Sequence, residues 1–69
     1  MTVNEINAEI ARYRAEIKEL ERDIDWRKEV LAEEMNPLYK SMWKDEIKWR
    51  RNQIKQNRNQ IKALKWVLG

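Results

Sequence analysis

The chain has 69 residues, of which 39% are charged and 42% hydrophobic, and its formal net charge at pH 7 is +3. A domain of this length hides only about 60% of the surface that its unfolded chain exposes, so its core is marginal. The sequence has no Cys and no His, which excludes disulfides and His/Cys metal sites and leaves self-association as the expected reinforcement.

The first half of the chain has the hydrophobic periodicity of an α-helix. Thr2 followed by Glu5 fits a capping box, in which side chains satisfy the unpaired amides at a helix start. Apolar residues then recur at spacings of three and four, with one interruption at Arg27, which predicts a heptad seam over four repeats. The sequence therefore predicts a first helix over residues 3–35. Its seam consists of Val3, Ile6, Ile10, Tyr13, Ile17, Leu20, Ile24 and Leu31.

The second half has a seam of its own, which ends before Gly69, the expected C-cap. The phase of the first seam, continued through the chain, would place Ser41 and Asp45 in the seam, so the two patterns do not belong to one continuous helix. The second seam consists of Trp43, Ile47, Ile54, Ile61, Leu64 and Leu68, interrupted by Arg50 and Asn57.

The break between the seams falls at Asn36-Pro37. Proline disfavours a helical conformation for the residue before it and suits the first turn of a new helix, with Asn36 as the cap. We therefore predict a turn at residues 36–37 and a second helix over residues 38–68. Beside this turn, we expect Glu34 and Lys40 to form an ion pair.

Folding the second helix back on the first brings the seams into register. In an antiparallel pair, the two residues of each layer lie equally far along the chain from the turn. Here the paired seam positions are all centred on Pro37, which is where the turn is predicted. The predicted fold is all-α, an antiparallel, coiled-coil-like two-helix hairpin in one domain over residues 1–69, which self-associates into a helical bundle. The layers include Ile10 with Leu64, Tyr13 with Ile61, Leu20 with Ile54, and Leu31 with Trp43.

Three predicted layers carry a polar side chain. Polar seam residues cost stability and often fix the register of the helices, while a long arginine can lie over the seam and bring its head to water. We interpret these residues in this way rather than as a ligand site. The layers are Ile17 with Asn57, Ile24 with Arg50, and Arg27 with Ile47.

Catalysis is not expected from this composition. General acid–base and nucleophilic catalysis depend mostly on His, Cys or an activated Ser, and the aliphatic hydroxyls of this chain are limited to Thr2 and Ser41. A glycine-rich phosphate loop needs several glycines, whereas the chain has one. Glu9, Glu16 and Asp23 share one helix flank, but neighbours lie about 10 Å apart, too far to coordinate one cation. We therefore expect no enzyme activity, cofactor or metal.

Charge is distributed unequally between the helices. Residues 1–37 contain six Lys/Arg and ten Asp/Glu, whereas residues 38–69 contain nine and two. Most of the second helix's cations follow spacings of four and three and so form one basic stripe about 32 Å long. The basic stripe consists of Lys44, Lys48, Arg51, Lys55, Arg58, Lys62 and Lys65.

Three interpretations of the basic stripe stay open. It is a solvated face, or it meets an acidic protein surface or the chain's own first helix, or it contacts the backbone of RNA or DNA, where neighbouring amide side chains would add hydrogen bonds. The heptad positions place the acidic flank of the first helix on the other side of the hairpin. Neutralisation of the stripe by that flank would therefore need a second chain.

Tryptophan is the other feature with a functional interpretation. Trp26 and Trp49 are expected at the same height on one side of the hairpin, with Val30 and Met42 beside them. An exposed apolar patch on a small protein usually marks an interaction site, and tryptophan is enriched among binding hot spots. These four residues form the predicted partner-binding patch, whereas Trp66 has no apolar neighbours that we can identify.

The sequence thus predicts a non-enzymatic protein-interaction module, a small oligomeric regulator or inhibitor of a larger protein. Its partners would be a protein, itself as a homodimer or higher oligomer, or both. The alternative is a hairpin that binds the RNA or DNA backbone with its basic stripe. No apolar run of about 18 residues and no signal-peptide pattern is present, so we expect a cytoplasmic protein with no membrane partner.

The layout resembles the dimeric helical hairpins of the plasmid-encoded Rop type, which pair into four-helix bundles and some of which bind RNA. The resemblance is one of architecture, and it implies a helical hairpin that can dimerise. It carries no site residues, because fold alone does not establish function.

Overall fold

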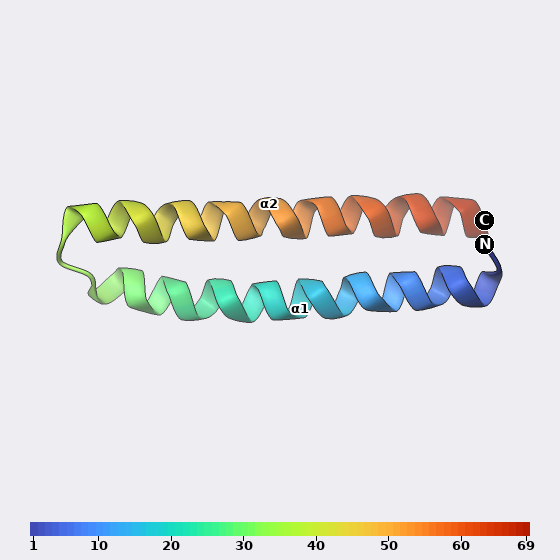
Figure 1. The fold of residues 1–69 in the computed structure, drawn as a ribbon, viewed down its shortest axis with the longest axis horizontal. Coiled ribbons are helices and arrows are strands. Elements are labelled where there is room, and N and C mark those ends of the chain that lie inside the picture. Colours follow the sequence, from blue (N-terminus) through green and yellow to red (C-terminus); the bar gives the residue numbers. More distant parts are fainter.

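The computed structural model, which describes residues 1–69, contains two long helices joined by a short connection (Figure 1). Helix α1 spans Val3–Glu33 and helix α2 spans Pro37–Leu68. They lie side by side and antiparallel in a body 51 Å long, with both ends of the described chain opposite the connection. The predicted all-α two-helix hairpin is confirmed.

The start of α1 is fixed by the capping box that the sequence predicts. The Thr2 hydroxyl oxygen accepts a hydrogen bond from the Glu5 N–H at 3.1 Å, and the Glu5 carboxylate accepts one from the Thr2 N–H at 3.4 Å. Loss of such a cap typically costs about 1 kcal/mol. These reciprocal bonds explain why the helix begins at Val3.

The end of α1 comes two residues earlier than expected. Glu34 has an extended backbone, with ψ at 126°, and its N–H closes the helix by donating to the Leu31 carbonyl at 3.2 Å. Its carboxylate accepts a hydrogen bond from the Asn36 N–H at 3.1 Å. The predicted Glu34–Lys40 ion pair is wrong, because these two side chains do not come within ion-pair distance and the Glu34 carboxylate turns to the backbone of the connection.

The start of α2 follows from Asn36 and Pro37. The Asn36 side chain accepts a hydrogen bond from the Leu38 N–H at 2.9 Å, and its extended backbone is the conformation that a following proline favours. Pro37 is the first residue of α2 rather than part of the turn, so residues 34–36 form the connection. At the other end, the Gly69 N–H caps α2.

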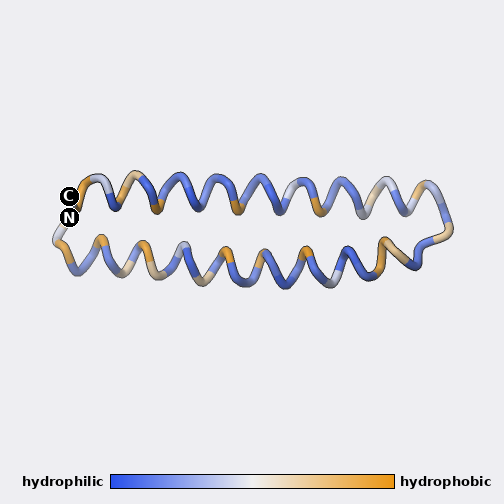
Figure 2. Tube along the Cα trace, turned by 180° about the vertical axis from the view of Figure 1, so that it is seen from behind, coloured by the Kyte–Doolittle hydropathy of each residue, from blue (hydrophilic) through white to orange (hydrophobic).

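The core is a row of isoleucines along the seam between the helices. Figure 2 shows it as hydrophobic positions on the edge of α1 that faces α2 and on the facing edge of α2. It is divided into two clusters. The terminal cluster contains Ile6, Ile10 and Ile61, with Tyr13, Ile17 and Leu64 packed against it. The turn-proximal cluster contains Ile24, Ile47 and Ile54, with Ile17, Leu20 and Leu31 packed against it.

Asn57 lies along α2 between the two clusters and is the one buried polar residue, 9% exposed. Its side-chain amide donates a hydrogen bond to the Glu16 carboxylate at 3.1 Å. Ile17, its predicted partner across the seam, packs against both clusters. A slipped register would separate Asn57 from Glu16 and leave the amide buried and unpaired, so this contact favours the observed register.

The core is small for the amount of apolar surface in the chain. Six hydrophobic residues are buried, no side chain is less than 2% exposed, and eleven large hydrophobic residues are exposed. The seam therefore buries only part of the apolar surface. Neither helix contains an apolar stretch that would span a lipid bilayer.

Candidate functional site

The isoleucine seam separates two long sides of the hairpin with different chemistry. We call the side that carries Trp26, Trp43 and Trp49 the tryptophan side. The opposite side, which carries Lys28 of α1 and the basic stripe of α2, we call the basic side. The sequence-predicted patch belongs to the first and the predicted stripe to the second.

Trp26 and Trp43 form an aromatic pair across the two helices. Their ring centroids are 5.7 Å apart and the ring planes are nearly perpendicular. Such an edge-to-face pair contributes about 0.5–1.5 kcal/mol beyond the area that it buries. Trp43 is half-buried, whereas Trp26 remains 53% exposed. The pair thus fixes the position of the Trp26 ring while leaving about half of its residue surface open.

The other predicted patch residues are open to different extents. Trp49 is 57% exposed and Met42 is 44% exposed, whereas Val30 is half-buried. Trp26 and Trp49 form no aromatic pair with each other. Each instead lies beside a seam arginine, with the Arg27 guanidinium 5.2 Å from the Trp26 ring and the Arg50 guanidinium 5.6 Å from the Trp49 ring.

These two seam arginines belong to an ion-pair network that sequence reasoning missed. Arg27 is 3.1 Å from Glu46, Arg50 is 3.8 Å from Asp23, and Asp23 is also 3.9 Å from Arg27. The arginine side chains are only 16% and 15% exposed, so their heads meet carboxylates rather than water. The available signal covers one contact of the network, because Asp23 precedes Arg27 by four residues, whereas the two contacts between the helices have no such local spacing.

The acidic flank of α1 is also neutralised within the chain. Arg12 lies between Glu9 and Glu16, 2.7 Å from the first carboxylate and 3.2 Å from the second. The hydrogen bond from Arg12 lowers the pKa of Glu9 below its ordinary value. Asp23, the third member of the flank, belongs to the arginine network. No second copy is needed to balance this flank, so it is a poor candidate counterpart for the basic stripe.

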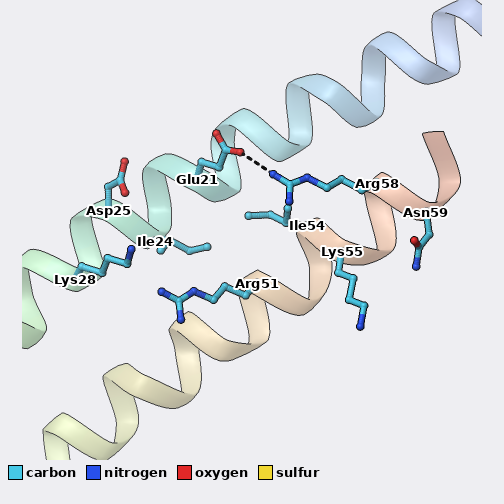
Figure 3. Close-up of a pocket in the computed structure, with 9 residues that line it drawn as sticks. All are labelled: Glu21, Ile24, Asp25, Lys28, Arg51, Ile54, Lys55, Arg58 and Asn59. Carbon is cyan, nitrogen blue, oxygen red and sulfur yellow. Dashed lines mark ion pairs between the residues drawn. The ribbon is translucent and has the colours of Figure 1, made fainter. Parts of the chain in front are cut away.

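The basic stripe is almost entirely unpaired. Arg58 alone has a carboxylate within ion-pair distance, that of Glu21 at 3.6 Å, and both side chains are more than half exposed (Figure 3). Exposed pairs of this kind contribute little to stability. The six stripe residues without an ion pair are Lys44, Lys48, Arg51, Lys55, Lys62 and Lys65.

Two grooves run along the basic side. The first is lined partly by carboxylates, and in it the Lys28 and Arg51 side chains extend from opposite helices toward the space between them (Figure 3). The second groove continues toward the turn, has a volume of about 350 Å³, and contains no carboxylate. It is lined by Lys28, Leu31, Lys44, Ile47, Lys48 and Arg51.

Lys28 is the cation of this groove that the stripe does not include. The sequence gives one indication of its position. Lys28 follows Glu21 by seven residues, or two helical turns, so both side chains lie on the same face of α1. The structure brings it beside α2 residues far away in the sequence, which helical phase within one helix does not reveal.

No protein-family model, curated protein or solved structure matches the chain. Its function must therefore be inferred from the chemistry of the two sides.

Proposed function

We propose that this hairpin is a non-enzymatic protein-interaction module that binds through its tryptophan side, first to a second copy of itself. We further propose that it regulates or inhibits a larger protein through the same surface. The observation that supports this function is the pair of half-exposed rings, Trp26 and Trp49, held beside a shared ion-pair network.

The way these rings are held suits a binding surface. An aromatic anchor gives most affinity when it is already in position, because little side-chain freedom is then lost on binding. Trp26 is braced by Trp43, and each exposed ring lies beside an arginine whose head is paired. The rings are therefore positioned before a partner arrives.

The size of the core supports self-association as the first step. A hairpin of two helices can bury each seam on one neighbour alone, and eleven large hydrophobic residues stay exposed against six that are buried. A second hairpin that covers the tryptophan side would remove apolar surface from water at about 25 cal/mol per Å². This contribution would strengthen a marginal fold without a disulfide or metal.

Sedimentation equilibrium of the wild-type chain and of Trp49→Ala at micromolar concentration tests the proposal. We expect the wild type to associate and the variant to lose about thirtyfold in affinity, since removal of an aromatic anchor costs about 2 kcal/mol. Trp66→Ala is the matched control, because this ring is 84% exposed and has no ring partner. A wild-type chain that sediments as a folded monomer would contradict self-association.

Binding to a larger protein needs a separate experiment. Tagged wild type and Trp49→Ala are compared as baits in a nuclease-treated lysate, with circular dichroism to show that both are helical. We expect proteins that are retained by the wild type and absent with the variant. Equal recovery on both baits would contradict the role of the tryptophan side.

A further inference from the structure

We propose that the outward face of α2 binds single-stranded nucleic acid, with phosphates on the basic stripe and a base stacked on Trp66. This activity would use the basic side and the adjoining end of α2, and it does not depend on the tryptophan side. Three features support it, namely the unpaired cations, the groove that they line and the exposure of Trp66.

Most cations of this face have no carboxylate within ion-pair distance, and the two carboxylates on the basic side, Glu21 and Asp25, belong to α1 and line the first groove. Of the seven stripe residues, only Arg58 has a carboxylate within ion-pair distance, and the acidic residues of α2 are limited to Asp45 and Glu46. Glu46 is committed to Arg27 on the tryptophan side. A row of like charges without partners repels itself, and a ligand with regularly spaced negative charges removes that repulsion. A nucleic acid backbone is such a ligand.

The turn-proximal groove supplies a place where one phosphate can meet several cations. Lys28 from α1 and Arg51 from α2 line this groove together with Lys44 and Lys48, and its lining contains no carboxylate. Arginine presents a planar fork of donors that matches phosphate oxygens. The groove therefore combines charge from both helices with directional hydrogen-bond donors.

The exposed ring of Trp66 favours a single strand over other polyanions as the ligand. It is 84% exposed, forms no aromatic or cation–π pair, and is separated from Lys62 by one helical turn. It follows Asn52 and Asn59 at seven-residue steps, so an amide line ending in an aromatic ring borders the stripe. Single-strand binding proteins combine a positively charged track with exposed aromatic rings on which bases stack. In a duplex the bases are paired inside the helix and cannot cover this ring.

The dimensions agree with a short segment of nucleic acid. The stripe is about 32 Å long at 1.5 Å per residue. A strand stacked as in a duplex rises 3.4 Å per nucleotide, so the stripe spans about nine nucleotides. This length lies within the range of sites, about 4–16 nucleotides, that single-strand binding folds cover.

The test measures fluorescence anisotropy of a labelled, mixed-sequence, fifteen-nucleotide RNA with the full chain at several salt concentrations. Lys48→Gln/Lys55→Gln is compared with Lys18→Gln/Arg22→Gln, which removes the same charge from exposed positions of α1. We expect the stripe variant to bind several-fold more weakly. The slope of its log affinity against log salt should be smaller by about 1.4, or 0.7 for each phosphate that the variant no longer neutralises. The control pair should retain the wild-type slope.

Stacking is tested with Trp66→Ala, Trp66→Phe and two competitors. We expect a loss of about fivefold or more for alanine and near wild-type binding for phenylalanine, because a phenyl ring still stacks. The duplex of the same sequence and a polyglutamate peptide of equal charge should both compete poorly. Equal loss in the two charge variants, no effect of Trp66→Ala, or equal competition by duplex or polyglutamate would overturn the inference.

Discussion

The arginines on the two sides of the hairpin differ in burial and in ion pairing. On the tryptophan side, Arg27 and Arg50 are about 15% exposed and lie next to carboxylates, whereas on the basic side Arg51 is exposed and has no acidic partner. Arg50 and Arg51 are adjacent in the sequence, and about 100° of helix rotation separates them. Residue type alone therefore does not show whether an arginine serves the fold or remains free for a ligand.

The largest difference between the sides should appear when a carboxylate is removed. Asp23→Ala takes one carboxylate from two mostly buried arginines, and we expect the free energy of unfolding to fall by about 1–2 kcal/mol. Glu21→Ala removes the exposed partner of Arg58 and should change the free energy of unfolding by less than about 0.5 kcal/mol. Urea unfolding followed by circular dichroism at one protein concentration measures both. Equal effects would mean that the arginine network does not contribute as its burial indicates.

A smaller effect of opposite sign should follow replacement of Arg50 itself. Its Nε is buried and has no hydrogen-bond partner, so the guanidinium is incompletely satisfied. Arg50→Leu should raise the free energy of unfolding by about 1 kcal/mol, because it removes a desolvated charge with an unpaired donor from the apolar seam. Arg51→Leu on the exposed side is the control and should stay within about 0.5 kcal/mol. A loss of stability in Arg50→Leu would show that its ion pair outweighs its desolvation.

The smallest effect concerns the pKa of Glu9, which its hydrogen bond from Arg12 lowers. A carboxylate with a lowered pKa in the folded state adds stability that is present above its unfolded pKa and is lost as pH falls through the folded pKa. NMR titration of the side-chain carboxyl carbon should give a Glu9 pKa below the ordinary glutamate value. Arg12→Gln should return it toward that value, and Arg22→Gln should not.

The sequence predicts the backbone of this protein better than its surface. The capping box at Thr2 and Glu5 and the cap at Asn36 use contacts within three residues, and such local chemistry can be read from the chain. The layered seam follows from periodicity, and residues paired in the predicted layers Ile10–Leu64 and Leu20–Ile54 occur in the same clusters.

The candidate sites depend on side-chain direction, which periodicity does not give. A seam position says that Arg27 lies between the helices, but not that its head meets Glu46 of the other helix. Helical phase places Trp26 on one side, but not against Trp43. The Glu34–Lys40 prediction was wrong for the same reason, since the spacing of the two residues does not show that the Glu34 carboxylate turns to the Asn36 N–H. Partner binding by either side remains a prediction.

The polar contact between Asn57 and Glu16 also bears on how the hairpin forms and opens. It lies between two isoleucine clusters that share Ile17 as a neighbour. Ile24 and Ile47 are much closer along the chain than Ile10 and Ile61, so the turn-proximal cluster closes a shorter loop at a lower entropic cost. We expect the helices to associate first near the turn and to separate first at the other end. Amide hydrogen exchange should therefore be slower around Ile47 than around Ile61.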